Sequence, residues 1–121
     1  MNTFVGLGAV FAGVAVVLGA FGAHALRATL TPEDLATFEV GVRYQMYHAL
    51  ALFVVAWATT QWQSTTLAAA GWAFVAGIVV FSGSLYVLVL TGQRWLGAIT
   101  PLGGVAFIVG WGLLAWTAVR S

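Results

Sequence analysis

Four long apolar stretches, divided by short polar connections, make up most of this 121-residue chain and constrain its fold more than any other feature. Apolar residues account for 62% of the chain and charged residues for 6%, whereas a soluble globular domain carries about 25% charged residues. Because a hydrocarbon core of ~30 Å needs roughly 20 apolar residues per helix, four such helices use up the chain. The sequence therefore predicts an all-α fold, an integral membrane four-helix bundle, with residues 1–121 as a single four-span transmembrane domain.

The first stretch, Phe4–Leu26, is predicted to be a retained membrane span and not a cleaved secretory signal. No basic residue precedes Arg27, and the stretch is much longer than the ~7 to 15 residues of a signal core. Its small residues recur at spacings of three and four, which places them on one helix face where a neighbouring backbone can approach closely. These residues are Gly8, Ala12, Ala15, Gly19 and Ala23.

The second helix is expected to begin outside the hydrocarbon core, as an interfacial N-terminal extension of its span. Thr31, Pro32 and the two acidic residues after them are typical of a helix start, because the hydroxyl caps free N–H groups and the acids lie near the positive end of the helix dipole. The apolar run Ala49–Ala58 then enters the lipid. Glu39 and Arg43 are four residues apart, which is the spacing of a solvated pair along a helix.

A turn of residues 61–65 leads to a third span, predicted over Thr66–Leu90 and closed by Gly92. The fourth span is predicted over Pro101–Val119. Thr100 before Pro101 repeats the capping pattern of the second helix, so we expect its hydroxyl to cap the fourth helix.

The alternation of four spans brings polar residues from all of them to one side of the membrane. The candidate binding residues there, called the polar cluster below, are His24, Arg43, Tyr44, Gln45, Tyr47, His48, Ser82, Ser84, Tyr86 and Thr100. The opposite end holds most of the tryptophans, as in an interfacial aromatic belt: Trp57, Trp62, Trp72, Trp111 and Trp116.

Two interpretations of the polar cluster stay open. In the first, the cluster is a hydrogen-bonded clamp between helices, because lipid offers buried polar groups no other partner. In the second, it lines a cavity for a proton, a small solute or a lipid headgroup. Both require hydrogen bonds between the second and third spans, with His24 close by. The expected partners are Tyr44, Tyr47 and His48 on one side and Ser82, Ser84 and Tyr86 on the other.

Catalytic, metal and nucleic-acid functions find little support in the sequence. The chain has two histidines and no cysteine, too few ligands for a zinc site and weak grounds for haem. Ser84 and His48 lack both an orienting acid and a nucleophile turn. Four scattered arginines and a net charge of +1 form no basic patch for nucleic acid. We therefore expect no enzyme activity, no cofactor and no metal.

Four ordered motifs resemble those of a known family. They are Gly19-Ala-Phe-Gly-Ala-His24, Tyr44-Gln-Met-Tyr-His48, Phe81-Ser-Gly-Ser-Leu-Tyr86 and Ile99-Thr-Pro-Leu-Gly-Gly104. The chain is similar along its whole length to small four-span bacterial membrane proteins of unknown function, of the YgdD and YwdK type. The resemblance implies a fold and a membrane location, and no established activity.

The expected function is that of a non-enzymatic structural or interaction component of the inner membrane. The bilayer and a second copy or another membrane protein are its expected partners, and the alternative is an oligomeric transporter for a small solute or linked to protons. Arg27, Arg43 and Arg94 lie at the polar end and Arg120 at the other. The positive-inside rule therefore places the polar cluster in the cytoplasmic half and both termini outside.

Overall fold

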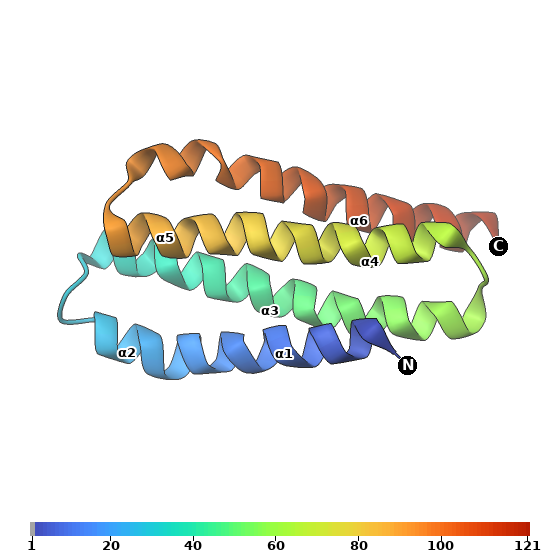
Figure 1. Ribbon diagram of the computed structural model, residues 1–121, viewed down its shortest axis with the longest axis horizontal. Helices are drawn as coiled ribbons and strands as arrows, with labels where there is room; N and C mark the ends of the chain where they lie inside the picture. The colour runs from blue at the N-terminus through green and yellow to red at the C-terminus, as the bar shows by residue number, and fades with distance from the viewer. Residues whose placement is uncertain (1) are drawn as a thin grey trace.

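The computed structural model describes residues 2–121, and within that range it contains helices and no strands (Figure 1). Two of the helical rods contain a wider π-helical turn, which is η1 in the first and η2 in the third. The first rod consists of α1 (Thr3–Val17), η1 (Leu18–Gly22) and α2 (Ala23–Leu26), and the second is α3 (Pro32–Gln61). The third consists of α4 (Thr65–Gly77), η2 (Ile78–Ser82) and α5 (Gly83–Thr91), and the fourth of the 3₁₀ turn η3 (Arg94–Ala98) and α6 (Thr100–Arg120).

Consecutive rods run antiparallel, so both termini and the turn at 62–64 lie at one end of the molecule (Figure 1). We call this the terminal end. The connections at 27–31 and 92–99 lie at the other end, which we call the loop end. Helix α3 packs against α1 on one side and against α4 and α5 on the other, while α6 packs mainly against α4 and η2. The second rod is therefore an inner element of the bundle.

Three rods are long and apolar enough to cross a membrane: Thr3–Leu26, Thr65–Thr91 and Arg94–Arg120. Helix α3 is not one of them, because acidic and basic residues occupy its first half and polar residues follow at its centre. Its 30 residues span about 45 Å, at 1.5 Å per residue, which is well over the ~30 Å of a hydrocarbon core. The first turns of α3 therefore come before its apolar run and exceed the length that a hydrocarbon core can hold.

The helix boundaries follow the local signals with one exception. Thr31 caps α3, since its hydroxyl accepts a hydrogen bond from the Asp34 backbone N–H at 3.1 Å. Gly92 ends α5 in the left-handed conformation, with φ of +74°. The expectation that Thr100 caps the fourth helix is wrong. The preceding 3₁₀ turn and Ile99 are already helical, so Thr100 lies inside the run and its hydroxyl serves another contact.

The small-residue face of the first rod packs against α3, as predicted from its spacing. A Cβ atom on Gly8 would lie 2.9 Å from the Ala49 carbonyl oxygen, and one on Gly19 would lie 3.2 Å from the Val42 side chain. Ala15 on the same face is only 1% exposed. The close approach of these two backbones thus depends on the absence of larger side chains on α1.

Phenylalanines fill the corresponding spaces between α4 and α6. The ring of Phe107 on α6 lies over Gly77, where a Cβ would come within 2.3 Å of it, and the ring of Phe74 on α4 lies over Gly110 in the same way, at 2.5 Å. Each aromatic ring needs a glycine opposite. The buried core around these contacts includes Leu52, Val55, Ala70, Phe74, Ile78 and Phe107.

Candidate functional site

Gln45 on α3 joins three rods through its side-chain amide. The amide nitrogen donates a hydrogen bond to the Phe11 carbonyl oxygen of α1 at 2.8 Å, and the amide oxygen accepts one from the Tyr86 hydroxyl of α5 at 2.7 Å. The side chain is 3% exposed. A buried amide with partners on both sides fixes the rotation of α3 relative to its neighbours.

Ser82 and Tyr86 are four residues apart and both face α3. The Ser82 hydroxyl donates to the Gly41 carbonyl oxygen at 2.6 Å, and Ser82 is fully buried. A glycine at position 41 lets the third rod come this close to α3, because a Cβ there would lie 2.9 Å from the Tyr86 ring. Ser82 ends the π-helical turn η2, whose extra residue rotates the helix beyond it.

Ser84 faces the opposite way, toward α6. Its hydroxyl lies 2.5 Å from the Thr100 hydroxyl and 2.9 Å from the Phe81 carbonyl oxygen. Thr100 is also within hydrogen-bonding distance of the Leu96 carbonyl oxygen. The hydroxyl that was expected to cap the fourth helix therefore links it to α5.

His48 is buried between α3 and α6, with both ring nitrogens hydrogen-bonded. The Trp111 indole N–H donates to Nε2 at 3.1 Å, and Nδ1 lies 2.7 Å from the Tyr44 carbonyl oxygen. Because Nε2 accepts and a carbonyl can only accept, this geometry corresponds to the neutral ring with its proton on Nδ1. The Phe107 ring stacks on the imidazole, with centroids 3.5 Å apart and planes 9° apart. Trp111, which is 44% exposed, therefore also contacts the interior through its indole N–H.

The hydrogen bonds expected from Tyr44, Tyr47 and His48 to the third rod are not formed. Tyr44 is 37% exposed and Tyr47 is 51% exposed, because the face of α3 that meets α5 carries Gln45. His24 and Arg43 are exposed and make no side-chain hydrogen bond within residues 2–121. Ser82 and Tyr86 of the third rod do contact α3 at the expected depth, but their partners there are the Gly41 carbonyl oxygen and the Gln45 side chain.

An ion pair closes the loop end of the molecule. The two terminal guanidinium nitrogens of Arg94 donate to the two oxygens of the Asp34 carboxylate, at 2.8 and 2.9 Å. The side chain of Asp34 is 13% exposed and that of Arg94 is 63% exposed. Hydrogen bonding to Arg94 lowers the pKa of Asp34 below its ordinary value. Arg94 is the partner of an acid on α3, whereas Glu39 and Arg43 form no ion pair in the described part of the chain.

This ion pair predicts a dependence of stability on pH. The folded-state pKa of Asp34 is below the unfolded value of 3.8, so its contribution is complete above that pH and is lost as the pH falls through the folded value. Thermal unfolding in detergent, followed from about pH 5 down to about pH 2, should therefore show a larger loss of stability for the wild type than for Asp34→Asn. Equal losses would mean that the pair contributes nothing.

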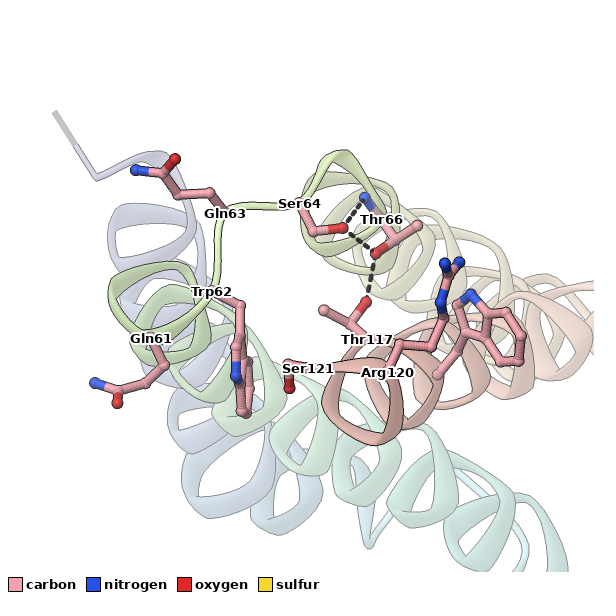
Figure 2. A pocket seen from close by; sticks show the side chains of 9 residues that line it. Gln61, Trp62, Gln63, Ser64, Thr66, Thr117, Arg120 and Ser121 are labelled. Atoms are coloured by element: carbon pink, nitrogen blue, oxygen red, sulfur yellow. Dashed lines mark hydrogen bonds between the residues drawn. The ribbon is translucent and has the colours of Figure 1, made fainter.

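A pocket at the terminal end has a volume of about 500 Å³ and contains no residue of the polar cluster in its lining (Figure 2). It is lined by Gln61, Trp62, Gln63, Ser64, Thr66, Trp116, Thr117, Arg120 and Ser121. We predicted none of these as binding residues. The available signals were the single arginine at that end and a threonine, Thr117, within an apolar helix. Within residues 2–121, no three His, Cys, Asp or Glu side chains are grouped for a metal ion.

A helical bundle with three apolar rods and a polar interior defines a small integral membrane protein. Residues 18–104 match the family described as "Protein of unknown function (DUF423)". The chain is 50% identical to the UPF0382 membrane protein YwdK of Bacillus subtilis over 121 residues, 99% of this chain and 98% of that protein. It is 48% identical to the UPF0382 membrane protein SAB0533 of Staphylococcus aureus over 94% of this chain and 93% of that protein. No solved structure matches the chain significantly.

The chain therefore belongs to the DUF423 family of uncharacterised membrane proteins, which confirms the resemblance to the YwdK type. The family match covers α3, η2, α5 and the start of α6, and so includes most of the interior hydrogen bonds.

Proposed function

We propose that this protein is a four-span, non-enzymatic structural or interaction component of the bacterial inner membrane, and that it self-associates. One observation carries the proposal: in residues 2–121, no buried side-chain nitrogen or oxygen lacks a hydrogen-bond partner. A site that binds a solute or relays a proton needs polar groups that are free to exchange partners. The groups in this interior are used to hold helices together.

The proposed crossing of α3 follows from its position. Helix α3 packs against α1, α4 and α5, and the side of α3 that meets these helices is shielded from lipid. Gln45 and His48, its most polar central residues, are 3% and 5% exposed. A helix whose polar side chains are satisfied by neighbours can cross a bilayer despite a modest hydropathy. We therefore count α3 as the fourth span.

Self-association is supported by the outer face of α1. Gly6 and Gly13 lie on this face, and a Cβ atom on either would meet nothing within 4 Å. Ala9 and Val10 between them are exposed as well. Glycine weakens a helix, and no contact within this protomer requires it at these positions. Small exposed residues at such spacings allow the helix of a second copy to approach closely.

The proposed orientation places the loop end in the cytoplasm and both termini outside. Arg27 and Arg94 occupy connections at the loop end, and Arg43 lies on the part of α3 that starts from it. Only Arg120 lies at the terminal end. The positive-inside rule counts basic residues near span ends and is not changed by the pairing of Arg94 with Asp34.

Cross-linking and flux assays test the two parts of this function. Val10→Cys on the outer face of α1 should form disulfide-linked dimers in membranes, and adding Gly13→Leu should suppress them. Ile108→Cys, 71% exposed on α6, is the matched control and should remain mainly monomeric. In proteoliposomes under a pH gradient, proton flux should equal that of empty liposomes. Equal cross-linking at both positions would contradict self-association through α1, and a flux that is lost in His48→Ala would favour the transporter.

A further inference from the structure

The pocket at the terminal end lies where the lipid headgroups of one leaflet would be. Trp62 and Trp116 form part of its wall, and tryptophan favours the interfacial level of a bilayer. The three elements around it are the last turn of α3, the first turn of α4 and the last turn of α6 (Figure 2). This placement depends on the proposed four-span arrangement, and it concerns a different part of the molecule from the polar interior.

Three of the four hydroxyl groups that line the pocket are hydrogen-bonded to one another, and the fourth, on Ser121, donates to the Ala118 carbonyl oxygen. Ser64, Thr66 and Thr117 point toward each other in Figure 2, with Ser64 and Thr66 2.6 Å apart and Thr66 bonded to Thr117. Thr117 also donates to the Leu113 carbonyl oxygen at 2.9 Å. Each hydroxyl has one hydrogen. The row of hydrogen bonds that runs from Ser64 through Thr66 and Thr117 to this carbonyl therefore uses the hydrogens of all three groups. They are acceptors toward a ligand and not donors.

Arg120 is the charged donor of the pocket. Its guanidinium lies 5.1 Å from the centre of the Trp116 ring, and among the described residues it forms no ion pair with an acid. Five N–H groups in a planar fork match the oxygens of a phosphate. Stacking on the indole holds the guanidinium at the edge of the pocket, where such a group can be reached from the interface.

The rest of the wall favours a positive group. Helices α3 and α6 both end at this pocket, and the last four carbonyl groups of a helix lack partners within it. The N-terminus of α4 adds one positive dipole end, but the two negative dipole ends and the three acceptor hydroxyls outweigh it and disfavour a ligand that carries only negative charge. An ammonium group next to the carbonyls would be stabilised by the helix ends and by the hydroxyl oxygens.

We propose that this pocket binds the headgroup of a zwitterionic phospholipid with a primary ammonium, such as phosphatidylethanolamine. Arg120 holds the phosphate, and the carbonyl ends of α3 and α6 hold the ammonium. The volume of about 500 Å³ lies in the range of small-ligand sites. The acyl chains extend along the apolar surface of α6, where Val109 and Trp116 are exposed.

Native mass spectrometry of the full-length protein tests this site. Protein in detergent is titrated with phosphatidylethanolamine or with phosphatidylglycerol of the same acyl chains. The wild type should retain phosphatidylethanolamine, and Arg120→Gln should bind it at least about tenfold more weakly, the loss expected for a charge-assisted hydrogen bond. Arg27→Gln, an exposed arginine at the loop end, is the matched control and should bind like the wild type.

Three results would overturn the proposal. They are equal binding of the two lipids by the wild type, unchanged binding in Arg120→Gln, and displacement of the lipid by inorganic phosphate at the same concentration, which would make free phosphate the ligand. Arg120 is exposed at the end of α6, so its replacement should leave the thermal unfolding temperature unchanged, and that measurement separates lost binding from lost folding. A failure of self-association would leave this result untouched.

Discussion

Gly103→Ala is expected to destabilise the bundle by about 1 to 3 kcal/mol or more, because the added methyl group has no space. A Cβ atom at Gly103 would lie 2.4 Å from the Phe81 backbone nitrogen and 2.7 Å from its Cα atom. The tip of a side chain could move aside, but here the added methyl group would meet the backbone of the η2 turn. Helix α6 would then have to move away from η2. That movement would also stretch the contact between Ser84 and Thr100.

Gly104→Ala is the matched control for this substitution. A Cβ atom on Gly104, the next residue of the same helix, would meet nothing within 4 Å. The change should therefore be neutral or stabilise the helix by up to about 1 kcal/mol. SDS titration in detergent micelles, followed by circular dichroism, measures both variants. Similar stabilities for the two variants would show that α6 does not lie against Phe81 as described.

Gln45→Leu should be the most costly change in the polar interior, at about 1 to 3 kcal/mol. The leucine removes the acceptor of the half-buried Tyr86 hydroxyl and leaves that group without a partner, while the bond to the Phe11 carbonyl is lost as well. The double variant Gln45→Leu with Tyr86→Phe removes both partners. Since replacing both ends of a buried hydrogen bond by apolar groups can be nearly neutral, the double variant should recover part of the loss.

A double-mutant cycle measures this coupling in the same unfolding assay. Tyr47→Phe provides the control, because Tyr47 is 51% exposed and its hydroxyl has no partner among the described residues. It should unfold like the wild type. Strictly additive effects of Gln45→Leu and Tyr86→Phe would mean that the two side chains do not interact.

Features set by a few neighbouring residues could be predicted from the sequence. The cap at Thr31 and the left-handed end at Gly92 each depend on one local group, and both are present. The small-residue face of α1 could also be predicted, since a spacing of three and four places residues on one side whatever the neighbour is. Gly8 and Gly19 accordingly pack against α3.

The partners within the polar interior could not be predicted, because they depend on how each helix is rotated. Successive residues differ by about 100° around a helix, so Tyr44 and Gln45 face different neighbours. Which of the two meets α5 is decided by Gly41, whose missing side chain admits the Tyr86 ring. The π-helical turn η2 adds a further rotation before Ser84, and no pattern with a period of 3.6 indicates it.

The contact that Thr100 makes could not be predicted for a similar reason. A threonine before a proline is a strong cap signal, but the turn η3 brings the chain into helical conformation before Thr100 is reached. Its hydroxyl is then available to Ser84. The distance between two rods, and not the local sequence, determines that choice.

The central claim is that α3 crosses the membrane as an inner span, and cysteine labelling from the two sides tests it most directly. The chain contains no cysteine, so each introduced one is the sole target. Ala28→Cys and Gln63→Cys stand in exposed connections at the two ends of α3. In intact cells a membrane-impermeant maleimide should label Gln63→Cys and should reach Ala28→Cys only after the membrane is opened. Labelling of both positions from the same side would contradict the crossing of α3 and with it the four-span bundle.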